Sequence, residues 1–200
     1  MVSIIYLLAF SGGFIIMSFE LLGGKVLAPY FGSSIYVWGS IISVFMLSLA
    51  IGYLIGGRWS VRNPSMAKFG SIFAIAAVLL YPLVSFAEPA MMFIFDRVED
   101  PRYGSLLASI VLFSVPTIIL GMISPYSVRL LVQEVERSGQ VAGFLYFVST
   151  LGSALGTLIT SFCFVLHFEI NTVLTAMTVA LLGAGAVAWL THRRTGSGTL

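Results

Sequence analysis

Long apolar stretches separated by short polar turns dominate the sequence. Six of them stand out: Ser3–Gly23, Ile35–Gly57, Met66–Ala87, Tyr103–Ile123, Val141–Phe164 and Ile170–Thr191. Each is close to the roughly 20 residues that a helix needs to cross the hydrocarbon core of a bilayer. Because lipid cannot satisfy backbone polar groups, such segments must be helices. The pattern predicts an all-α integral membrane protein with six transmembrane helices.

Composition supports this class of protein. Of the 200 residues, 58% are hydrophobic and 9% are charged, whereas a soluble domain carries about 25% charged residues. The net charge of +2 is too small to indicate a nucleic-acid partner. We expect a single transmembrane domain over residues 1–192 and a short tail over residues 193–200. The one cysteine, Cys163, falls in an apolar run and is expected to be a small buried side chain.

Basic residues give the expected orientation. Both chain ends and the second and fourth loops share one side of the membrane, which carries Arg58, Arg62, Lys68, Arg129, Arg137, Arg193 and Arg194. The other side carries Lys25, Arg97 and Arg102. The positive-inside rule therefore predicts cytoplasmic termini, and a bacterial inner membrane is the simplest location.

Small residues recur at every fourth position in the second and fifth segments. They are Ser48, Gly52 and Gly56 in the second, and Ser149, Gly152, Ser153, Gly156 and Thr157 in the fifth. This spacing lets helix backbones approach closely. Because the stripe occupies the second helix of each set of three, it also suggests an inverted 3+3 repeat, as in half of a major-facilitator bundle. General helix packing is the simpler alternative.

Glu20 is the most informative single residue, because an ionisable group in hydrocarbon costs on the order of 3 kcal/mol or more. It is either a cation or proton site at the mouth of a cavity, or a structural carboxylate that caps a helix or pairs with Lys25. In the turn that follows, Ser34 is a candidate helix N-cap. Tyr36 and Trp38 suit an aromatic belt at the membrane boundary, or an aromatic box for an organic cation.

Arg129 follows Pro125 at the expected end of the fourth helix, and a short amphipathic surface helix is expected beyond it. The Arg129 side chain could hold a phosphate, a partner protein, or the nearby Glu134 and Glu136. The two histidines, His167 and His192, are too few for a convincing metal cluster. Motifs of hydrolases, phosphate loops and dinucleotide sites do not occur in the sequence. We therefore expect no cofactor, no metal and no catalytic activity.

The run from Ser11 to Arg58, SGGFIIMSFELLGGKVLAPYFGSSIYVWGSIISVFMLSLAIGYLIGGR, resembles the membrane region of fused major-facilitator/spermidine-synthase proteins. The later stretches LGMISPYSVRLL and GQVAGFLYFVSTLGSALGTLITSF resemble the same family. Members commonly continue into a soluble domain that resembles spermidine synthase. No such domain is visible here, so the resemblance implies that aminopropyl transfer does not reside in this chain.

Two functions from different classes follow. The first is a non-catalytic membrane subunit that anchors or organises a partner, either a separate synthase-like protein or another membrane complex. The second is a transporter or channel for polyamines or other organic cations, working as a homo-oligomer. A single six-helix half is small for alternating access, which generally uses two halves. One intramembrane carboxylate per chain is also too little negative charge to balance a polycation.

Overall fold

The computed structural model describes residues 1–98, 100–132 and 134–196, and these residues form helices and short connections without strands. The helices are α1 (Val2–Phe31), α2 (Ile35–Val61), α3 (Met66–Leu80), α4 (Leu83–Phe95), α5 (Pro101–Gly121), α6 (Ile123–Leu131), α7 (Ser138–Ile159), α8 (Val165–His167) and α9 (Ile170–Gly196). A 3₁₀ turn at Val135–Arg137 precedes α7, and a π-helical turn at Thr160–Phe164 follows it. The all-α prediction is confirmed.

Five helical runs are long and apolar enough to cross a membrane: Val2–Phe31, Ile35–Val61, Pro101–Leu131, Val135–His167 and Ile170–Arg194. Helices α3 and α4 pass the same test as a pair, with a bend of 48° between them. The described chain therefore has five candidate spans, or six if the bent pair is one span. This is the composition of a multi-pass membrane protein.

Prolines explain where the predicted segments break. The segment Met66–Ala87 was expected to be one helix, but α3 ends at Leu80. Pro82, next to the break, has no N–H to donate to the carbonyl one turn earlier. Pro125 has the same effect on the Gly121 carbonyl, at the junction of α5 and α6. Pro125 therefore lies near the start of α6 and not at a helix end, and α6 continues through Arg129.

Helix α1 is longer than the sequence pattern indicated. The turn was expected to start near Gly23, yet the helix runs through Gly24, Lys25 and Pro29 to Phe31. Gly23 and Gly24 are small contact points rather than helix ends, because the Phe113 ring packs at Gly23 and the Trp38 ring at Gly24. The helix ends at Phe31, and Gly32 follows it with a positive φ of 75°, which glycine adopts without strain.

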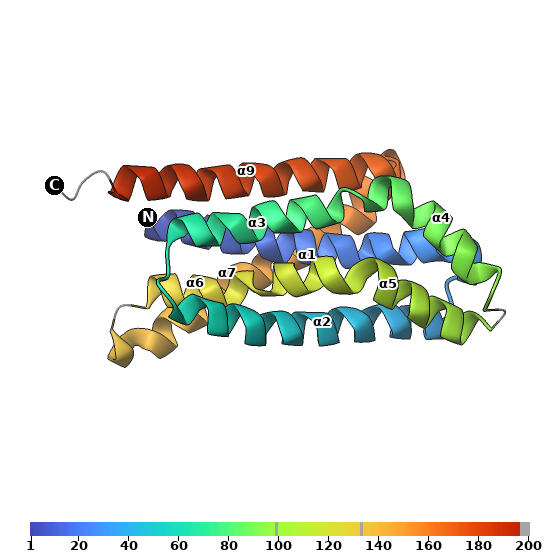
Figure 1. The fold of residues 1–200 in the computed structure, drawn as a ribbon, viewed down its shortest axis with the longest axis horizontal. Coiled ribbons are helices and arrows are strands. Elements are labelled where there is room, and N and C mark those ends of the chain that lie inside the picture. Colours follow the sequence, from blue (N-terminus) through green and yellow to red (C-terminus); the bar gives the residue numbers. More distant parts are fainter. Residues whose placement is uncertain (99, 133, 197–200) are drawn as a thin grey trace.

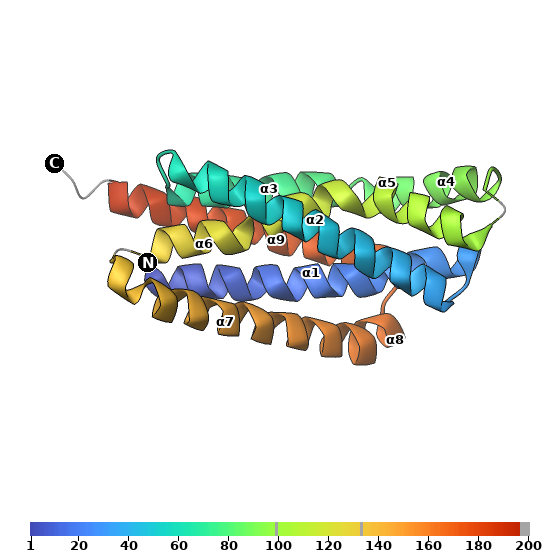
Figure 2. The same ribbon diagram turned by 90° about the horizontal axis from the view of Figure 1, so that it is seen from below.

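The helices lie side by side in an elongated bundle (Figures 1 and 2). The start of α1, the α2–α3 connection, the end of α6 and the last turns of α9 lie at one end, which we call the terminal end. The α1–α2, α4–α5 and α8–α9 connections lie at the other, which we call the distal end. The main pairings are α1 with α7, α2 with α5, and α3 with α9.

Glycines make the first two pairings unusually close. A Cβ atom added at Gly52 or Gly56 of α2 would collide with the backbone at Ile118 or Met122. A Cβ atom added at Gly152 of α7 would collide with the Phe10 carbonyl of α1. Gly156 of α7 is in the same position against Phe14. Gly52, Gly56, Gly152 and Gly156, which the sequence assigned to helix packing, therefore lie at these close contacts.

These two sets of contacts correspond residue by residue. The same number of positions separates Gly52 from Gly152 and Gly56 from Gly156. A second constant separation relates their partners, Phe10 to Ile118 and Phe14 to Met122. The reverse contacts obey the same two separations, because Gly13 meets the Ser149 carbonyl while Gly121 meets the Leu49 carbonyl. The α1–α7 and α2–α5 crossings are thus built from equivalent positions.

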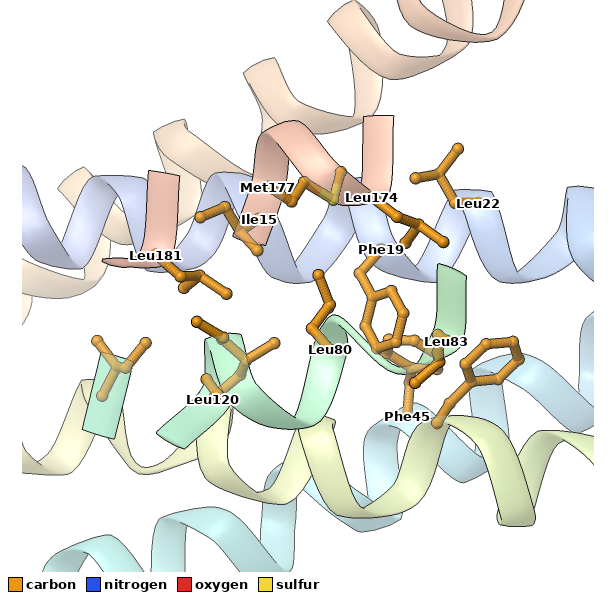
Figure 3. Close-up of a cluster of buried hydrophobic side chains, with 14 of the residues drawn as sticks. Ile15, Phe19, Leu22, Phe45, Leu80, Leu83, Leu120, Leu174, Met177 and Leu181 are labelled. Carbon is orange, nitrogen blue, oxygen red and sulfur yellow. The ribbon is translucent and has the colours of Figure 1, made fainter. Parts of the chain in front are cut away.

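Aromatic and aliphatic side chains fill the interior of the bundle (Figure 3). The ring of Phe19 in α1 contacts those of Phe45 in α2 and Phe113 in α5, each with 5.4 Å between ring centroids. Leu80 and Leu83, on either side of the α3–α4 bend, lie beside this cluster together with Leu174 of α9. Close packing of this kind, with interhelical hydrogen bonds, holds helices together where lipid surrounds them.

Substitution of Gly152 by alanine should lower the thermal unfolding temperature in detergent, because the added methyl group must push α1 and α7 apart. Overpacking of this kind typically costs about 1–3 kcal/mol. Gly143 is the matched control, since it lies in the same helix with nothing within 4 Å of an added Cβ atom. Gly143→Ala should leave the unfolding temperature unchanged or raise it. Equal behaviour of the two variants would contradict the close α1–α7 contact.

Candidate functional site

Glu20 is half-buried in α1, two turns beyond the close contact with α7. Helical spacing puts it on the same face as Gly13, Met17 and Gly24. Gly13 contacts Ser149 of α7, and Gly24 contacts Trp38 of α2. Glu20 therefore lies along the side of α1 that turns from α7 toward α2. Within the described residues its carboxylate makes no hydrogen bond or ion pair, so neither the pairing with Lys25 nor a capping role is formed.

Lys25 lies farther along α1 and borders a cavity of about 620 Å³ at the distal end. The cavity lies between α1, α4 and the α8–α9 connection, and its other charged groups are Glu88 and Glu169. Leu22, Val26 and Met91 give it apolar walls. A cavity of this size could hold a small organic molecule. Its two carboxylates and one ammonium favour a ligand that carries a positive charge.

The candidate residues of the α1–α2 connection and the start of α2 do not border this cavity. Ser34 is the N-cap residue of α2 by position, but its hydroxyl makes no capping hydrogen bond. The Tyr36 ring faces the Arg102 guanidinium at 4.9 Å, and the Trp38 ring packs on Gly24. The Trp38 ring thus packs on α1 one helical turn beyond Glu20, whereas the Tyr36 ring already contacts a cation of the chain itself.

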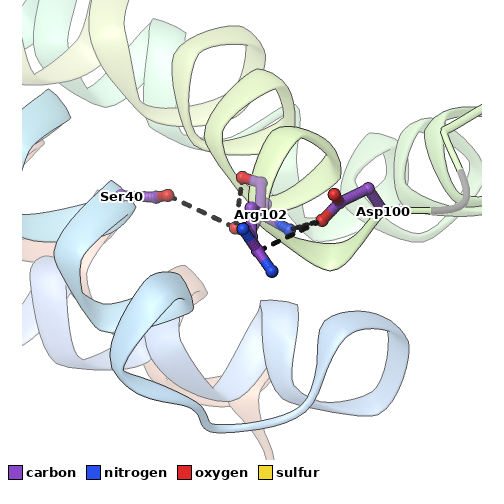
Figure 4. A network of polar contacts seen from close by, with 4 residues as sticks. Ser40, Asp100 and Arg102 are labelled. Carbon is purple, nitrogen blue, oxygen red and sulfur yellow. Dashed lines mark hydrogen bonds and ion pairs between the residues drawn. The ribbon is translucent and has the colours of Figure 1, made fainter.

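Arg102 belongs to a polar cluster that connects the starts of α2 and α5 (Figure 4). Its Nε atom lies 3.9 Å from Asp100 Oδ1, and the Asp100 side chain caps α5 by accepting from the Arg102 N–H at 2.9 Å. Ser105 donates to the Arg102 carbonyl at 3.1 Å, and its hydroxyl lies 3.3 Å from that of Ser40. The Arg102–Asp100 ion pair is exposed and adds little stability, whereas Ser105 is buried and the Asp100 cap fixes the start of α5.

Arg129 is exposed near the end of α6, and its side chain makes no hydrogen bond or ion pair with the described residues. The expected pairing with Glu134 or Glu136 is wrong, because Arg137 takes Glu134 instead, with 3.4 Å between Nε and Oε2. The expected surface helix beyond Arg129 is also wrong. Helix α6 ends at Leu131 and only a 3₁₀ turn precedes α7, while Gln133 lies outside the described residues.

The other small residues of these stripes, Ser48, Ser149, Ser153 and Thr157, lie as follows. Ser48 is buried in α2, and the Ser149 carbonyl is the contact that Gly13 accommodates. Ser153 and Thr157 donate to carbonyls one turn earlier in α7, at 3.2 and 3.0 Å. Their hydroxyls are thereby satisfied within their own helix. Cys163 is exposed on the π-helical turn, so the expectation that it is buried is wrong.

A cavity of about 160 Å³ lies where α1, α2, α5, α6 and α7 meet. Its wall contains equivalent residues from the two glycine crossings, namely Gly12 with Leu120, Gly13 with Gly121, Ile16 with Ser124, Leu49 with Ser149, and Tyr53 with Ser153. Serine hydroxyls and the Tyr53 side chain are its polar groups. Sequence reasoning missed this cavity, since no single segment shows which faces of the helices meet.

Sequence reasoning also missed a buried hydrogen-bonded pair. Thr160 Oγ1 donates to Ser18 Oγ at 2.8 Å, and Ser18 Oγ donates to the Gly156 carbonyl at 3.3 Å. Thr160 opens the π-helical turn, where the backbone pattern changes, so this pair connects α1 to the point at which α7 loses its regular form. In the sequence, the only indication of this pair was a serine, Ser18, inside an apolar segment.

Within the described residues, no group of three or more His, Cys, Asp or Glu side chains could hold a metal ion. Comparison with known proteins finds no matching family model, no matching curated protein and no matching solved structure. The class of protein therefore comes from the fold itself: an all-helical chain whose long apolar helices are those of a multi-pass membrane protein.

Proposed function

We propose that the chain crosses a bacterial inner membrane six times, with α3 and α4 together as one bent span and both termini in the cytoplasm. The distribution of basic residues supports this topology. Lys25, Arg97 and Arg102 lie toward the distal end, and the other described Arg and Lys residues lie at the terminal end. Such an excess of Arg and Lys is typical of cytoplasmic loops.

Thiol labelling from each side of the membrane tests this topology. In a Cys163→Ser background, Val61→Cys, at the exposed end of α2 just before the bent pair, should react only from the cytoplasmic side. Asp96→Cys at the distal end should react only from the outside. If both cysteines reacted from the same side, the bent pair would not be a complete span. If the sides were reversed, the orientation would be wrong.

The six spans also form an inverted repeat in this proposal, with α1 to α4 related to α5 to α9. The equivalence of the two glycine crossings supports the repeat. The repeat relates α1 to α5 and α2 to α7, so the α1–α7 contact in one half corresponds to the α5–α2 contact in the other. The 160 Å³ cavity has equivalent residues on both sides of the same junction. In transporters with inverted repeats, sites lie at the interface of the repeats.

For the function, we propose a non-catalytic membrane subunit that anchors or organises a partner protein, in keeping with the resemblance to the membrane part of spermidine-synthase-like proteins. The observation that carries this proposal is the docking segment at the terminal end, which comprises residues 129–132 and 134–139. Within it, the Arg129 side chain makes no hydrogen bond or ion pair with the described residues, and Val135 is 82% exposed. The adjoining α7 packs chiefly on α1 and leaves its outer side uncovered (Figure 2). A protein partner whose surface contacts both a positive charge and an apolar side chain would fit this segment.

Cross-linking in native membranes, followed by purification and mass spectrometry, tests the anchoring function. A stoichiometric partner should cross-link to the docking segment, and the double variant Arg129→Glu, Val135→Asp should lose most of that product. Arg97→Glu is the matched control, because Arg97 is an exposed arginine at the distal end, just beyond α4, and among the described residues it contacts the carbonyl and ring of Phe93. An unchanged cross-linking pattern in the double variant would contradict docking at this segment.

A second candidate function is a path for organic cations, and one observation favours it: Glu20 has no partner among the described residues, although it lies within a candidate span. An ionised carboxylate with no counter-charge attracts a cation. The filled Phe19, Phe45 and Phe113 cluster argues against a path through the middle of a single chain. A path along Glu20 would instead run between copies in a homo-oligomer.

Flux measurements separate this alternative from the anchoring function. In proteoliposomes loaded with a labelled diamine, Glu20→Gln should abolish any cation flux while leaving the unfolding temperature unchanged or raised, because it removes an unpaired charge. Glu136→Gln is the control, since Glu136 is exposed and also unpaired. If the wild-type protein moves no cation, or if Glu20→Gln moves as much, the carboxylate has no part in transport.

A further inference from the structure

A second large cavity opens at the terminal end, between α2, α3 and α5. It has a volume of about 760 Å³. Its walls are Ile55, Arg58, Trp59, Arg62, Ile72, Ile75, Ile119 and Met122. The two arginines are one helical turn apart, so they lie on the same face at the end of α2. All the other wall residues are apolar or aromatic, and no carboxylate is among them.

The guanidinium groups of Arg58 and Arg62 are available for a ligand. Both residues are exposed, and within the described chain neither side chain makes a hydrogen bond or an ion pair. The Arg62 carbonyl accepts from Lys68 Nζ at 2.7 Å, which fixes the backbone at this corner and brings a third positive charge close by. Two planar guanidinium groups with free N–H donors match the oxygens of a phosphate.

The apolar part of the cavity lies deeper in the bundle than the charges. Ile72 and Ile75 come two or more turns into α3, and Ile55 comes nearly one turn before Arg58 in α2. Ile55 and Ile75 are each exposed by slightly more than two fifths, so this wall faces the surroundings of the bundle. Trp59 stands beside the arginines and its ring packs against Tyr126 at 6.0 Å, a position that suits the membrane–water boundary.

We propose that this cavity is a binding site for one anionic phospholipid of the leaflet at the terminal end. The phosphate lies between Arg58 and Arg62, and an acyl chain lies along Ile55, Ile72 and Ile75. Charge complementarity selects an anionic headgroup, because three nearby positive charges have no acidic neighbour in the cavity wall. The order of the groups, charge at the end and isoleucines deeper, is that of a lipid molecule in a bilayer. The site depends on the placement of the bundle in a membrane and not on the partner protein.

Native mass spectrometry of the purified full chain in mild detergent tests the site directly. The probes are phosphatidylglycerol, phosphatidylcholine with the same acyl chains, and inorganic phosphate. Phosphatidylglycerol should bind at one site at least tenfold more tightly than phosphatidylcholine, and inorganic phosphate should compete only weakly. In the double variant Arg58→Gln, Arg62→Gln the affinity for phosphatidylglycerol should fall about 30-fold, at roughly 1 kcal/mol for each arginine.

Three further variants keep the result unambiguous. Arg193→Gln is the matched control, because it removes an exposed arginine from the same end but outside the cavity and the docking segment, and it should leave the affinity within twofold of wild type. Arg58→Lys, Arg62→Lys keeps the charge and should lose several-fold in affinity if the planar guanidinium groups bind the phosphate. Ile75→Trp should weaken lipid binding and leave the competition by phosphate unchanged.

Several outcomes would overturn the proposal. If the two lipids bound equally, the site would not select the headgroup. If Arg193→Gln lost as much affinity as the double variant, the binding would be general attraction by the charged end. Competition by inorganic phosphate as strong as that by the lipid would make the cavity a site for soluble phosphate. An unchanged affinity in both double variants would place the lipid elsewhere.

Discussion

The close approach of helix backbones at Gly52, Gly56, Gly152 and Gly156 is the constraint on which the rest of this bundle depends. In lipid, apolar side chains gain little by leaving their surroundings, so helix pairs depend on contact area and on short distances. Glycine supplies both by letting one backbone lie against the next. Once α1 lies on α7 and α2 on α5, the Phe19, Phe45 and Phe113 rings are brought together between them.

The sequence predicted this part of the fold well, and the reason is physical. Segment length and small-residue spacing are local properties, so both the helices and the contact faces of α2 and α7 could be derived from the sequence. The breaks at Pro82 and Pro125 and the extension of α1 past Pro29 could not. A proline removes one hydrogen bond wherever it stands, but tertiary packing decides whether the helix then bends, breaks or continues. Trp38 on Gly24 is such a contact in α1.

The candidate sites were predicted less completely, because they depend on which helix faces meet. Glu20 stood out by its chemistry alone, and the structure leaves it unpaired. The expected partners of Glu20 and Arg129 were chosen by nearness in sequence, and in both cases the side chains do not meet. The arginine cavity combines α2 with α3 and α5, and the distal cavity combines α1 with α4 and α9. Neither combination follows from the order of segments.

The distribution of polar groups favours a protein that works at its ends and surface rather than through its middle. The interior along α1 is filled by Ile15, Phe19 and Leu22, together with side chains from α3, α4 and α9 (Figure 3). The unpaired arginines lie at the terminal end, where an anionic lipid at Arg58 and Arg62 would fix the depth of α2 in the membrane. Arg129 and the docking segment lie at the same end but on other elements. A lipid that holds the bundle at a set depth would therefore also set the height at which that segment meets a partner.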